Sequence, residues 1–333
     1  MHLAIIPRFP LCQLPTPLER ADHLESLLGR DCPRIFVKRD DLTGLAFGGN
    51  KGRKLDYLVA DAIATGATTL VSEGAVQSNH ARMTAAAAAV AGLRCVLILD
   101  SRHGSDVVGN LLLDHLFGAE VRLVDTPEAR AAEMAAIDDE LRAAGEVPYI
   151  VPTGGSVPLG ATGYVAAVAE LTEQLLQVGE APRRLYHATG SLGTQAGLVV
   201  GKRAFSSSFE VYGVAVSHPR EHLVETGVRL ANETAAFIGL EAEFDEGDIV
   251  VDGDFVGEAY GVPTAGCREA IRLVARTEGI VLDPVYSGKA MAALVAHVRA
   301  GHYSADDSVV FLHTGGAPTI FSAADTLAAH LRG

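Results

Sequence analysis

Short strand-like runs alternate along this chain with longer helix-like stretches, and no other feature constrains the fold as much. The strand-like runs are rich in β-branched and apolar residues, whereas the helix-like stretches repeat apolar residues at helical spacing. The predicted strands cover residues 34–39, 68–72, 95–99, 121–124, 149–151, 184–187, 210–216 and 308–313. The predicted helices include residues 51–64, 79–91, 127–144, 161–176, 194–204 and 288–300. This alternation predicts βαβ units, and therefore a mostly parallel sheet with helices on both faces.

Glycine and proline mark the ends of several predicted helices. A glycine, which tolerates positive φ, follows four of the helical stretches: Gly66, Gly92, Gly145 and Gly301. Thr126 precedes Pro127, a pattern typical of an N-cap followed by proline at the first helical position. No linker, repeat or low-complexity tract divides the chain, so a domain border has to be argued from topology.

The charge balance excludes some classes of partner. The 333 residues include 27 basic and 41 acidic side chains, a formal charge of −14. Nucleic acids and anionic membranes need a positive face, so neither is an expected partner. The four cysteines form no C-x-x-C pair, so neither a zinc knuckle nor a thioredoxin-like motif is present, and no metal site is expected. Residues 1–12 make a poor signal peptide and residues 83–93 are too short to span a bilayer, so a cytoplasmic protein is expected.

Lys51 is the most informative candidate for chemistry. It follows Gly48-Gly49-Asn50 at the predicted start of a helix. A lysine that attacks an aldehyde must lose its proton, and nearby positive charge from Arg53 and Lys54 would lower its pKa. Most lysines are solvated surface residues, and that interpretation is favoured on position alone. A cation at a helix N-terminus is nevertheless unfavourable, which indicates an anionic ligand or a function.

A glycine-rich turn lies between a predicted strand and a predicted helix. It reads Thr189-Gly190-Ser191-Leu192-Gly193-Thr194. Free backbone N–H groups and the positive end of a helix bind phosphate at such turns, and the hydroxyls add donors. The turn matches neither the dinucleotide fingerprint nor the Walker A motif. An ordinary tight turn is an equally good interpretation of this motif alone.

Other polar turns also follow predicted strands or precede predicted helices. Gln77-Ser78-Asn79-His80 opens a predicted helix, where Ser78 or Asn79 could serve simply as the N-cap and His80 could be structural. The carboxyl ends of parallel strands also bind ligands in α/β sheets. Three further turns are Tyr260-Gly261-Val262-Pro263-Thr264, Asp283-Pro284-Val285-Tyr286-Ser287-Gly288 and His313-Thr314-Gly315-Gly316.

One motif is interpreted as chance. His218-Pro219-Arg220-Glu221-His222 spells H-x-x-E-H, an inverted zinc-protease string. That chemistry needs both histidines on one helical face, whereas His218 precedes a proline and is disfavoured in the helical region. The segment is predicted to be a helix N-terminus with Pro219 at the first helical position.

Together these motifs resemble the D-cysteine desulfhydrase and 1-aminocyclopropane-1-carboxylate deaminase family over nearly the whole chain. The motifs that carry the resemblance are Lys38-Arg39-Asp40-Asp41, Gly48 to Leu55, Gln77 to His80, the glycine-rich turn, Asp283 to Tyr286 and His313 to Gly316. The resemblance implies pyridoxal-phosphate fold type II, an α/β fold with two open, twisted, mostly parallel sheets. It also implies a large domain of residues 1–50 plus 153–333, a small inserted domain of residues 51–152, and a homodimer.

The resemblance also implies roles for individual residues. Lys51 would carry pyridoxal phosphate as a Schiff base, Asn79 would bind the ring hydroxyl, and Thr314 would face the pyridine nitrogen. Further cofactor contacts are expected from Asn50 and from the turn, Thr189, Gly190, Ser191, Leu192, Gly193 and Thr194. The catalytic residues would be Lys51, Ser78, Tyr260 and Tyr286, and the amino-acid substrate would contact Ser78, Asn79, His80, Tyr260, Tyr286 and Ser287.

The implied reaction is α,β-elimination, with D-cysteine giving pyruvate, ammonia and hydrogen sulfide. Members that open the cyclopropane ring carry glutamate where this chain has Ser287, so ring opening is the weaker alternative. L-Cysteate sulfo-lyase also lacks the glutamate and remains an alternative. A catalytically silent protein that binds pyridoxal phosphate or an amino acid is the alternative outside enzymes. Stereochemistry, the leaving group and the choice of Lys51 or Ser78 as the base stay open.

Overall fold

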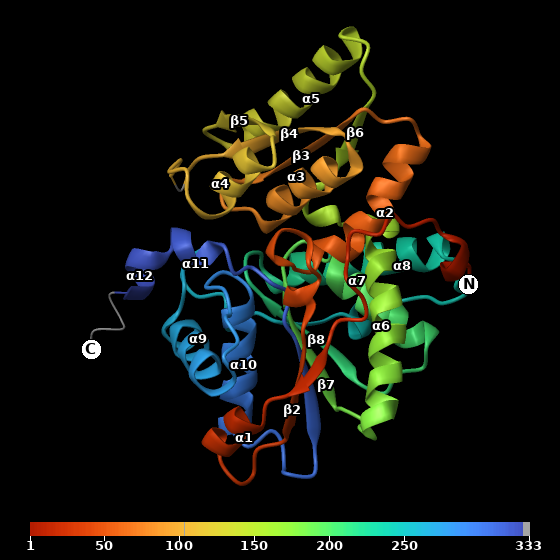
Figure 1. The fold of residues 1–333 in the computed structure, drawn as a ribbon. Helices are drawn as coiled ribbons and strands as arrows, with labels where there is room; N and C mark the ends of the chain where they lie inside the picture. Colours follow the sequence, from red (N-terminus) through yellow and green to blue (C-terminus); the bar gives the residue numbers. More distant parts are fainter. Residues whose placement is uncertain (103, 329–333) are drawn as a thin grey trace.

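Two separate sheets organise the computed structural model, which describes residues 1–102 and 104–328 (Figure 1). The larger sheet has strand order β1-β2-β10-β7-β8-β9, and the smaller has β5-β4-β3-β6. The larger contains β1 (Leu18–Arg20), β2 (Arg34–Lys38), β7 (Arg184–Thr189), β8 (Glu210–Ala215), β9 (Val250–Asp252) and β10 (Ser308–Leu312). The smaller contains β3 (Thr69–Ala75), β4 (Arg94–Asp100), β5 (Glu120–Val124) and β6 (Pro148–Val151). Neighbouring strands are parallel except β1 and β2.

Helices cover both faces of each sheet. The larger sheet packs α6 (Pro158–Val178), α7 (Gly193–Ala204) and α8 (Arg220–Phe237) on one face, and α1 (Asp22–Leu28), α9 (Ala265–Glu278) and α10 (Ser287–Arg299) on the other. The smaller packs α2 (Lys51–Ala64), α3 (Asn79–Ala91) and α4 (Gly109–Leu116) on one face, and α5 (Pro127–Ala143) on the other. The short helices α11 (Thr319–Ser322) and α12 (Ala324–Ala328) follow β10, and α11 packs against α4. The predicted α/β class with two mostly parallel sheets is confirmed.

Alternation along the central strands produces the two cores of the larger sheet. In β2, Phe36 faces α6 to α8, whereas Ile35 and Val37 face α1, α9 and α10. In β10, Val310 faces α6 to α8, whereas Val309 faces α1, α9 and α10. Successive side chains of a strand point to opposite faces, so both faces of these strands must be apolar. Their continuous hydrophobic runs reflect that requirement.

Several predicted boundaries agree with the structure and others do not. The helices at 51–64 and 79–91 are confirmed, as are Thr126 as an N-cap and positive φ at the four glycines. The position of Pro219 is corrected by one residue, because it is the N-cap and α8 begins at Arg220. The prediction did not include β1 or β9, which have three residues each, nor α1, α4, α8 in full, α9, α11 and α12.

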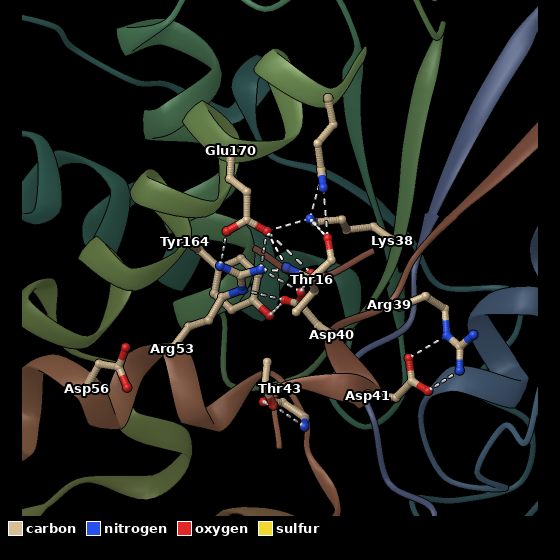
Figure 2. Close-up of polar contacts among 12 residues, drawn as sticks. Thr16, Lys38, Arg39, Asp40, Asp41, Thr43, Arg53, Asp56, Tyr164 and Glu170 are labelled. Carbon is tan, nitrogen blue, oxygen red and sulfur yellow. Dashed lines mark hydrogen bonds and ion pairs between the residues drawn. The ribbon is translucent and has the colours of Figure 1, made fainter. Parts of the chain in front are cut away.

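The helix that begins at Lys51 is anchored to the larger sheet by a buried charge network (Figure 2). Arg53 is 2% exposed and donates to both oxygens of Asp40 at 2.8 Å and to Glu170 at 2.9 Å. Tyr164 donates to Asp40 at 2.6 Å, and Lys38 donates to Glu170. These bonds join α2 to the segment after β2 and to α6. The domain division at residues 50/51 and 152/153 stays a prediction, because α2 packs against both α6 and α3.

Within residues 1–102 and 104–328, no helix is both long and apolar enough to cross a membrane.

Candidate active site

A cavity of about 490 Å³ lies where the turns after β3, β7 and β10 meet the start of α2. The turns follow the carboxyl ends of parallel strands, where α/β sheets place their ligand sites. Most of the predicted site residues line this cavity: Asn50, Lys51, Ser78, Asn79, His80, Thr189, Gly190, Ser191, Leu192, Thr194, Tyr260, Tyr286 and Thr314. Gly193 and Ser287 do not line it. The structure thus brings together residues from almost the whole length of the chain.

Lys51 lies at the cavity wall, with its amine largely surrounded by protein. Its Nζ donates to Oδ1 of Asn50 at 3.0 Å. Burial, followed by the positive charge of Arg82, lowers the pKa of Lys51 to about 8, and Asp283 opposes that shift. The expectation that Arg53 and Lys54 supply the charge is therefore wrong. Arg53 pairs with Asp40 and Glu170, and burial holds the pKa of Lys54 well below its usual value.

Asn50 connects the lysine to the glycine-rich turn. While its Oδ1 accepts from Lys51, its Nδ2 donates to Oγ1 of Thr194 at 2.9 Å. In the described chain the N–H groups of Ser191, Leu192 and Thr194 have no protein acceptor. Leu192 has a φ of 64°, which gives the turn left-handed backbone immediately before α7. Successive free N–H groups at a helix start form an anion site.

Ser156 and Lys54 complete the surroundings of this turn. The Ser156 hydroxyl donates to Oγ of Ser191 at 2.8 Å and accepts from the N–H of Gly193 at 3.2 Å. Lys54 donates to the carbonyl of Gly154 at 2.9 Å, and a Cβ on Gly193 would lie 2.8 Å from its amine. Gly193 therefore has to be a glycine. Free N–H groups, hydroxyls and a buried amine form a donor set that fits a phosphate.

Ser78, Asn79 and His80, at the start of α3, also line the cavity. Ser78 is the N-cap, since its hydroxyl accepts from the N–H of Ala81 at 3.2 Å. A Cβ on Gly74 would lie 2.8 Å from this hydroxyl, so the strand end leaves room for Ser78. His80 bonds with Ser72 at 3.0 Å, and burial, reinforced by Lys51 and Lys54, lowers its pKa to about 3. His80 is therefore a neutral ring at physiological pH.

Two tyrosines form a third wall. The hydroxyl oxygens of Tyr260 and Tyr286 are 2.5 Å apart, and burial raises the pKa of both groups. Ser287 follows Tyr286 but does not line the cavity. Its hydroxyl donates to Oδ1 of Asp283 at 2.6 Å and accepts from the N–H of Asp283 at 2.8 Å. Its predicted contact with substrate stays a prediction without geometric support.

Sequence reasoning missed several residues of this site. The outer wall includes Asp100, Arg102, Arg130 and His218, and Asp100 pairs with both arginines. No motif marks Asp100, Arg102 or Arg130, whereas His218 belongs to the H-x-x-E-H string interpreted above as chance. Arg82 did leave a signal, because it stands one helical turn after Asn79 and therefore on the same face of α3.

The fold and the site define a class of protein in which a lysine with a lowered pKa stands beside a glycine-rich turn whose free N–H groups fit a phosphate. A family model described as "Pyridoxal-phosphate dependent enzyme" matches residues 10–315, and the chain belongs to this family. Pyridoxal phosphate is therefore its cofactor, and the donor set around Lys51 and the turn fits that group.

Relatives place the chain more narrowly within the family. It is 41% identical over 326 residues to the D-cysteine desulfhydrase of Salmonella choleraesuis (strain SC-B67), a match that covers 96% of this chain and 97% of the relative. It is 40% identical to the D-cysteine desulfhydrase of Salmonella typhi, with the same coverage. A solved ACC deaminase homologue has a TM-score of 0.89 at 36% identity, covering 98% of this chain and 97% of its own. A solved threonine deaminase has a TM-score of 0.65 at 24% identity, covering 90% and 92%, and shows the fold alone.

Proposed function

We propose that this chain is a lyase that catalyses α,β-elimination on a small β-substituted amino acid, and that D-cysteine is its substrate. D-Cysteine and water would give pyruvate, ammonia and hydrogen sulfide. The observation that carries the proposal is the placement of Lys51, joined through Asn50 to a turn with free N–H groups. The two D-cysteine desulfhydrases, each 40% identical or more, support the choice of substrate.

The residues on the cavity wall have distinct roles in holding the cofactor. Lys51 would hold it covalently as a Schiff base, and the turn of residues 189–194, with Lys54 behind it, would hold its phosphate. Asn79 would bond its ring hydroxyl, and Thr314 would present a neutral hydroxyl to its ring nitrogen. When bound, pyridoxal phosphate supplies the electron sink that makes the Cα–H bond of an amino acid acidic.

The chain itself then moves the protons. Lys51, whose pKa of about 8 makes it a base near neutral pH, accepts the proton from Cα, with Ser78 as the alternative acceptor. Ser78 also holds the substrate carboxylate. Tyr260 and Tyr286 flank the β-substituent. Because burial keeps both hydroxyls protonated, either can donate a hydrogen bond to the departing sulfur.

Position 287 favours elimination over ring opening. Serine cannot give the acid–base help that the opening of a cyclopropane ring requires, and the Ser287 hydroxyl is already committed to Asp283. L-Cysteate, which would release sulfite, is the competing substrate. If the protein bound pyridoxal phosphate or an amino acid but formed no product, it would instead be a catalytically silent binding protein.

Product analysis tests the proposal. The purified protein, loaded with pyridoxal phosphate, is incubated with D-cysteine, L-cysteine, L-cysteate or 1-aminocyclopropane-1-carboxylate. Sulfide, sulfite and α-ketobutyrate are then measured in parallel. We expect sulfide and pyruvate from D-cysteine at the highest kcat/KM. Sulfite from L-cysteate or α-ketobutyrate at a higher kcat/KM would contradict the substrate, and no product from any of the four would contradict the enzyme assignment.

Lys51→Ala provides the matching test of mechanism. We expect loss of the visible absorbance of bound cofactor and a fall in turnover of roughly 10²–10⁴-fold or more. Lys202→Ala, which removes a lysine near the end of α7, should leave both unchanged. Full turnover by Lys51→Ala would refute the role of this amine.

We also propose a cytoplasmic homodimer. The four free cysteines fit a reducing compartment, and the dimer rests on the family resemblance. Light scattering of the loaded protein would give twice the 34.8 kDa mass of one chain. A monomer mass would contradict the dimer.

A further inference from the structure

Arg82 is a fully buried cation whose hydrogen-bond acceptors are all neutral. Its Nη1 donates to Oδ1 of Asn79 at 3.1 Å and to Oδ1 of Asn110 at 3.0 Å, and its Nη2 donates to the carbonyl of Gly48 at 3.0 Å. Its Nε has no partner among the described residues. Buried arginines are normally paired with carboxylates, because an uncompensated charge is costly away from water. The environment of Arg82 is therefore unusual for a buried arginine.

The carboxyl groups near Arg82 do not compensate its charge through hydrogen bonds. Both oxygens of Asp114 lack a hydrogen-bond partner in the described chain, and burial raises the pKa of Asp114 to about 8, so this group is largely uncharged at neutral pH. The oxygens of Asp283 accept from the start of α10, namely the N–H groups of Val285, Tyr286 and Ser287 and the Ser287 hydroxyl. Arg82 is therefore a buried charge without a hydrogen-bonded carboxylate, one helical turn from Asn79 on α3.

The bond to Asn79 fixes the orientation of that amide. Oδ1 of Asn79 accepts from Arg82 and also from Nδ2 of Asn110 at 2.9 Å. With two donors on its oxygen, the amide of Asn79 leaves its NH₂ group for the cavity that it lines. Asn110 is held in turn by Gln77, because Nδ2 of Asn110 donates to the Gln77 carbonyl at 2.8 Å.

The bond to Gly48 connects the same guanidinium to the turn that precedes Lys51. Gly48 has a φ of 68°, and a Cβ there would lie 1.9 Å from the carbonyl oxygen of Asp41, so the turn has one tightly constrained shape. Arg82 therefore joins the start of α3, in the smaller sheet's layer, to the glycine pair before α2. Its charge also contributes to the lowered pKa of Lys51.

We propose that Arg82 is a positioning residue for the cofactor: it aims the NH₂ group of Asn79 into the cavity and holds beside Lys51 a positive charge that an anionic cofactor neutralises. The inference rests on the proposed seat of pyridoxal phosphate at Lys51. A purely structural arginine would stabilise the cofactor-free and the cofactor-loaded protein equally, whereas a positioning arginine would stabilise the loaded protein more.

Thermal unfolding with and without pyridoxal phosphate distinguishes the two roles. Wild type should gain thermal stability on loading, and Arg82→Gln should gain much less, with cofactor binding weakened about 10- to 100-fold, the range of a lost hydrogen bond to a charged group. Arg82→Lys keeps the charge without the planar set of donors, so it should bind cofactor with intermediate affinity. Arg94→Gln, which removes an exposed arginine paired with Glu120 and Glu146, is the control and should match wild type.

A double-mutant cycle tests the link to Asn79. If Arg82 acts through Asn79, Arg82→Gln should cost a smaller factor in cofactor affinity when Asn79→Ala is already present. Additive losses, or equal falls in thermal stability of the empty and loaded Arg82→Gln protein, would overturn the inference. If Arg82→Gln does not fold, unchanged affinity of Arg82→Lys would overturn it instead. A wild-type protein that takes up no cofactor would refute the proposed function itself, before any variant is compared.

Discussion

Gly49 packs so closely against Thr314 that a Cβ on Gly49 would lie 3.1 Å from the Thr314 carbonyl oxygen. The same oxygen accepts from the N–H of Asn50 at 3.0 Å. A Cβ on Gly315 would in turn lie 2.6 Å from Cα of Gly49. Two turns that are far apart in sequence therefore cross with only glycine backbone between them, and this crossing sets Lys51 beside Thr314.

Gly49→Ala should displace this crossing. The φ of Gly49 is 132°, so alanine adds backbone strain of about 1–3 kcal/mol in addition to the close contact with Thr314. We expect weaker cofactor uptake, measured by the visible absorbance of the loaded protein. Gly66→Ala is the matched control, because Gly66 also has positive φ (75°) but has open space around it. Equal cofactor uptake by the two variants would contradict the proposed importance of the crossing.

Ser78→Ala should separate capping from catalysis. Loss of the N-cap should lower the free energy of unfolding by about 0.5–2 kcal/mol. If Ser78 also contacts the substrate, kcat/KM for D-cysteine should fall well beyond that of a capping variant, while the absorbance of bound cofactor persists. Thr126→Ala removes an equivalent cap from α5, where Thr126 accepts from the N–H of Ala129 at 3.1 Å. The same kcat/KM in both variants would leave Ser78 with a capping role alone.

Arg53→Met should destabilise the fold more than most single substitutions. Removing one partner from a buried ion pair leaves Asp40 uncompensated and costs about 3–5 kcal/mol. The change can be measured by urea unfolding of the loaded protein. Arg142→Ala breaks an exposed pair with Asp138 on α5 and should cost no more than about 1 kcal/mol. A comparable loss in both variants would argue against anchoring of α2 by Arg53.

The stability of the cofactor-free protein should depend on the titration of Lys51. The pKa of this amine is about 8 in the folded chain and 10.5 when unperturbed. Between these values the unfolded chain binds more protons than the folded chain, so the contribution of Lys51 to stability rises with pH, by roughly 3 kcal/mol in total. Below pH 8 both states carry the proton and the cost of burying the charge is fully present.

The measurement compares wild type with Lys51→Met, both without cofactor. The difference in their free energies of unfolding should increase in favour of wild type from about pH 8 to about pH 10.5. Groups that titrate in this range and do not interact with Lys51 contribute equally to both proteins. If the free energies of unfolding of the two proteins changed in parallel with pH, burial would not lower the pKa of Lys51.

The sequence predicts most of the sheet and helix framework because its central strands are continuous apolar runs. β2, β7, β8 and β10 are buried on both faces, so periodicity and length identify them. β1 and β9 are three-residue strands at the sheet edges, and a pattern of three residues carries too little periodicity to be recognised. Polar positions in α8 and α9 concealed those helices, which owe their stability to the face that packs on the larger sheet.

Some residues of the site can likewise be predicted from the sequence, and others cannot. Lys51, Ser78, Asn79 and Thr314 belong to motifs next to glycine or at helix starts, and such motifs are visible in a single sequence. Ser156 acts through a contact with Ser191, which is distant in sequence, so nothing near Ser156 in the sequence indicates its role. The spacing of Arg82 from Asn79 places both on one face of α3, but the burial of Arg82 and its bond to Gly48 cannot be inferred from the sequence. The charge of Arg53 was misassigned for the same reason, because its partner Glu170 lies more than a hundred residues away.

The bond from Arg82 to the Gly48 carbonyl crosses from the layer of one sheet to the turn that carries the reactive amine. Because Gly48 lies just before Lys51 in the chain, a substitution that shifts α3 would also disturb the backbone that supports the reactive amine.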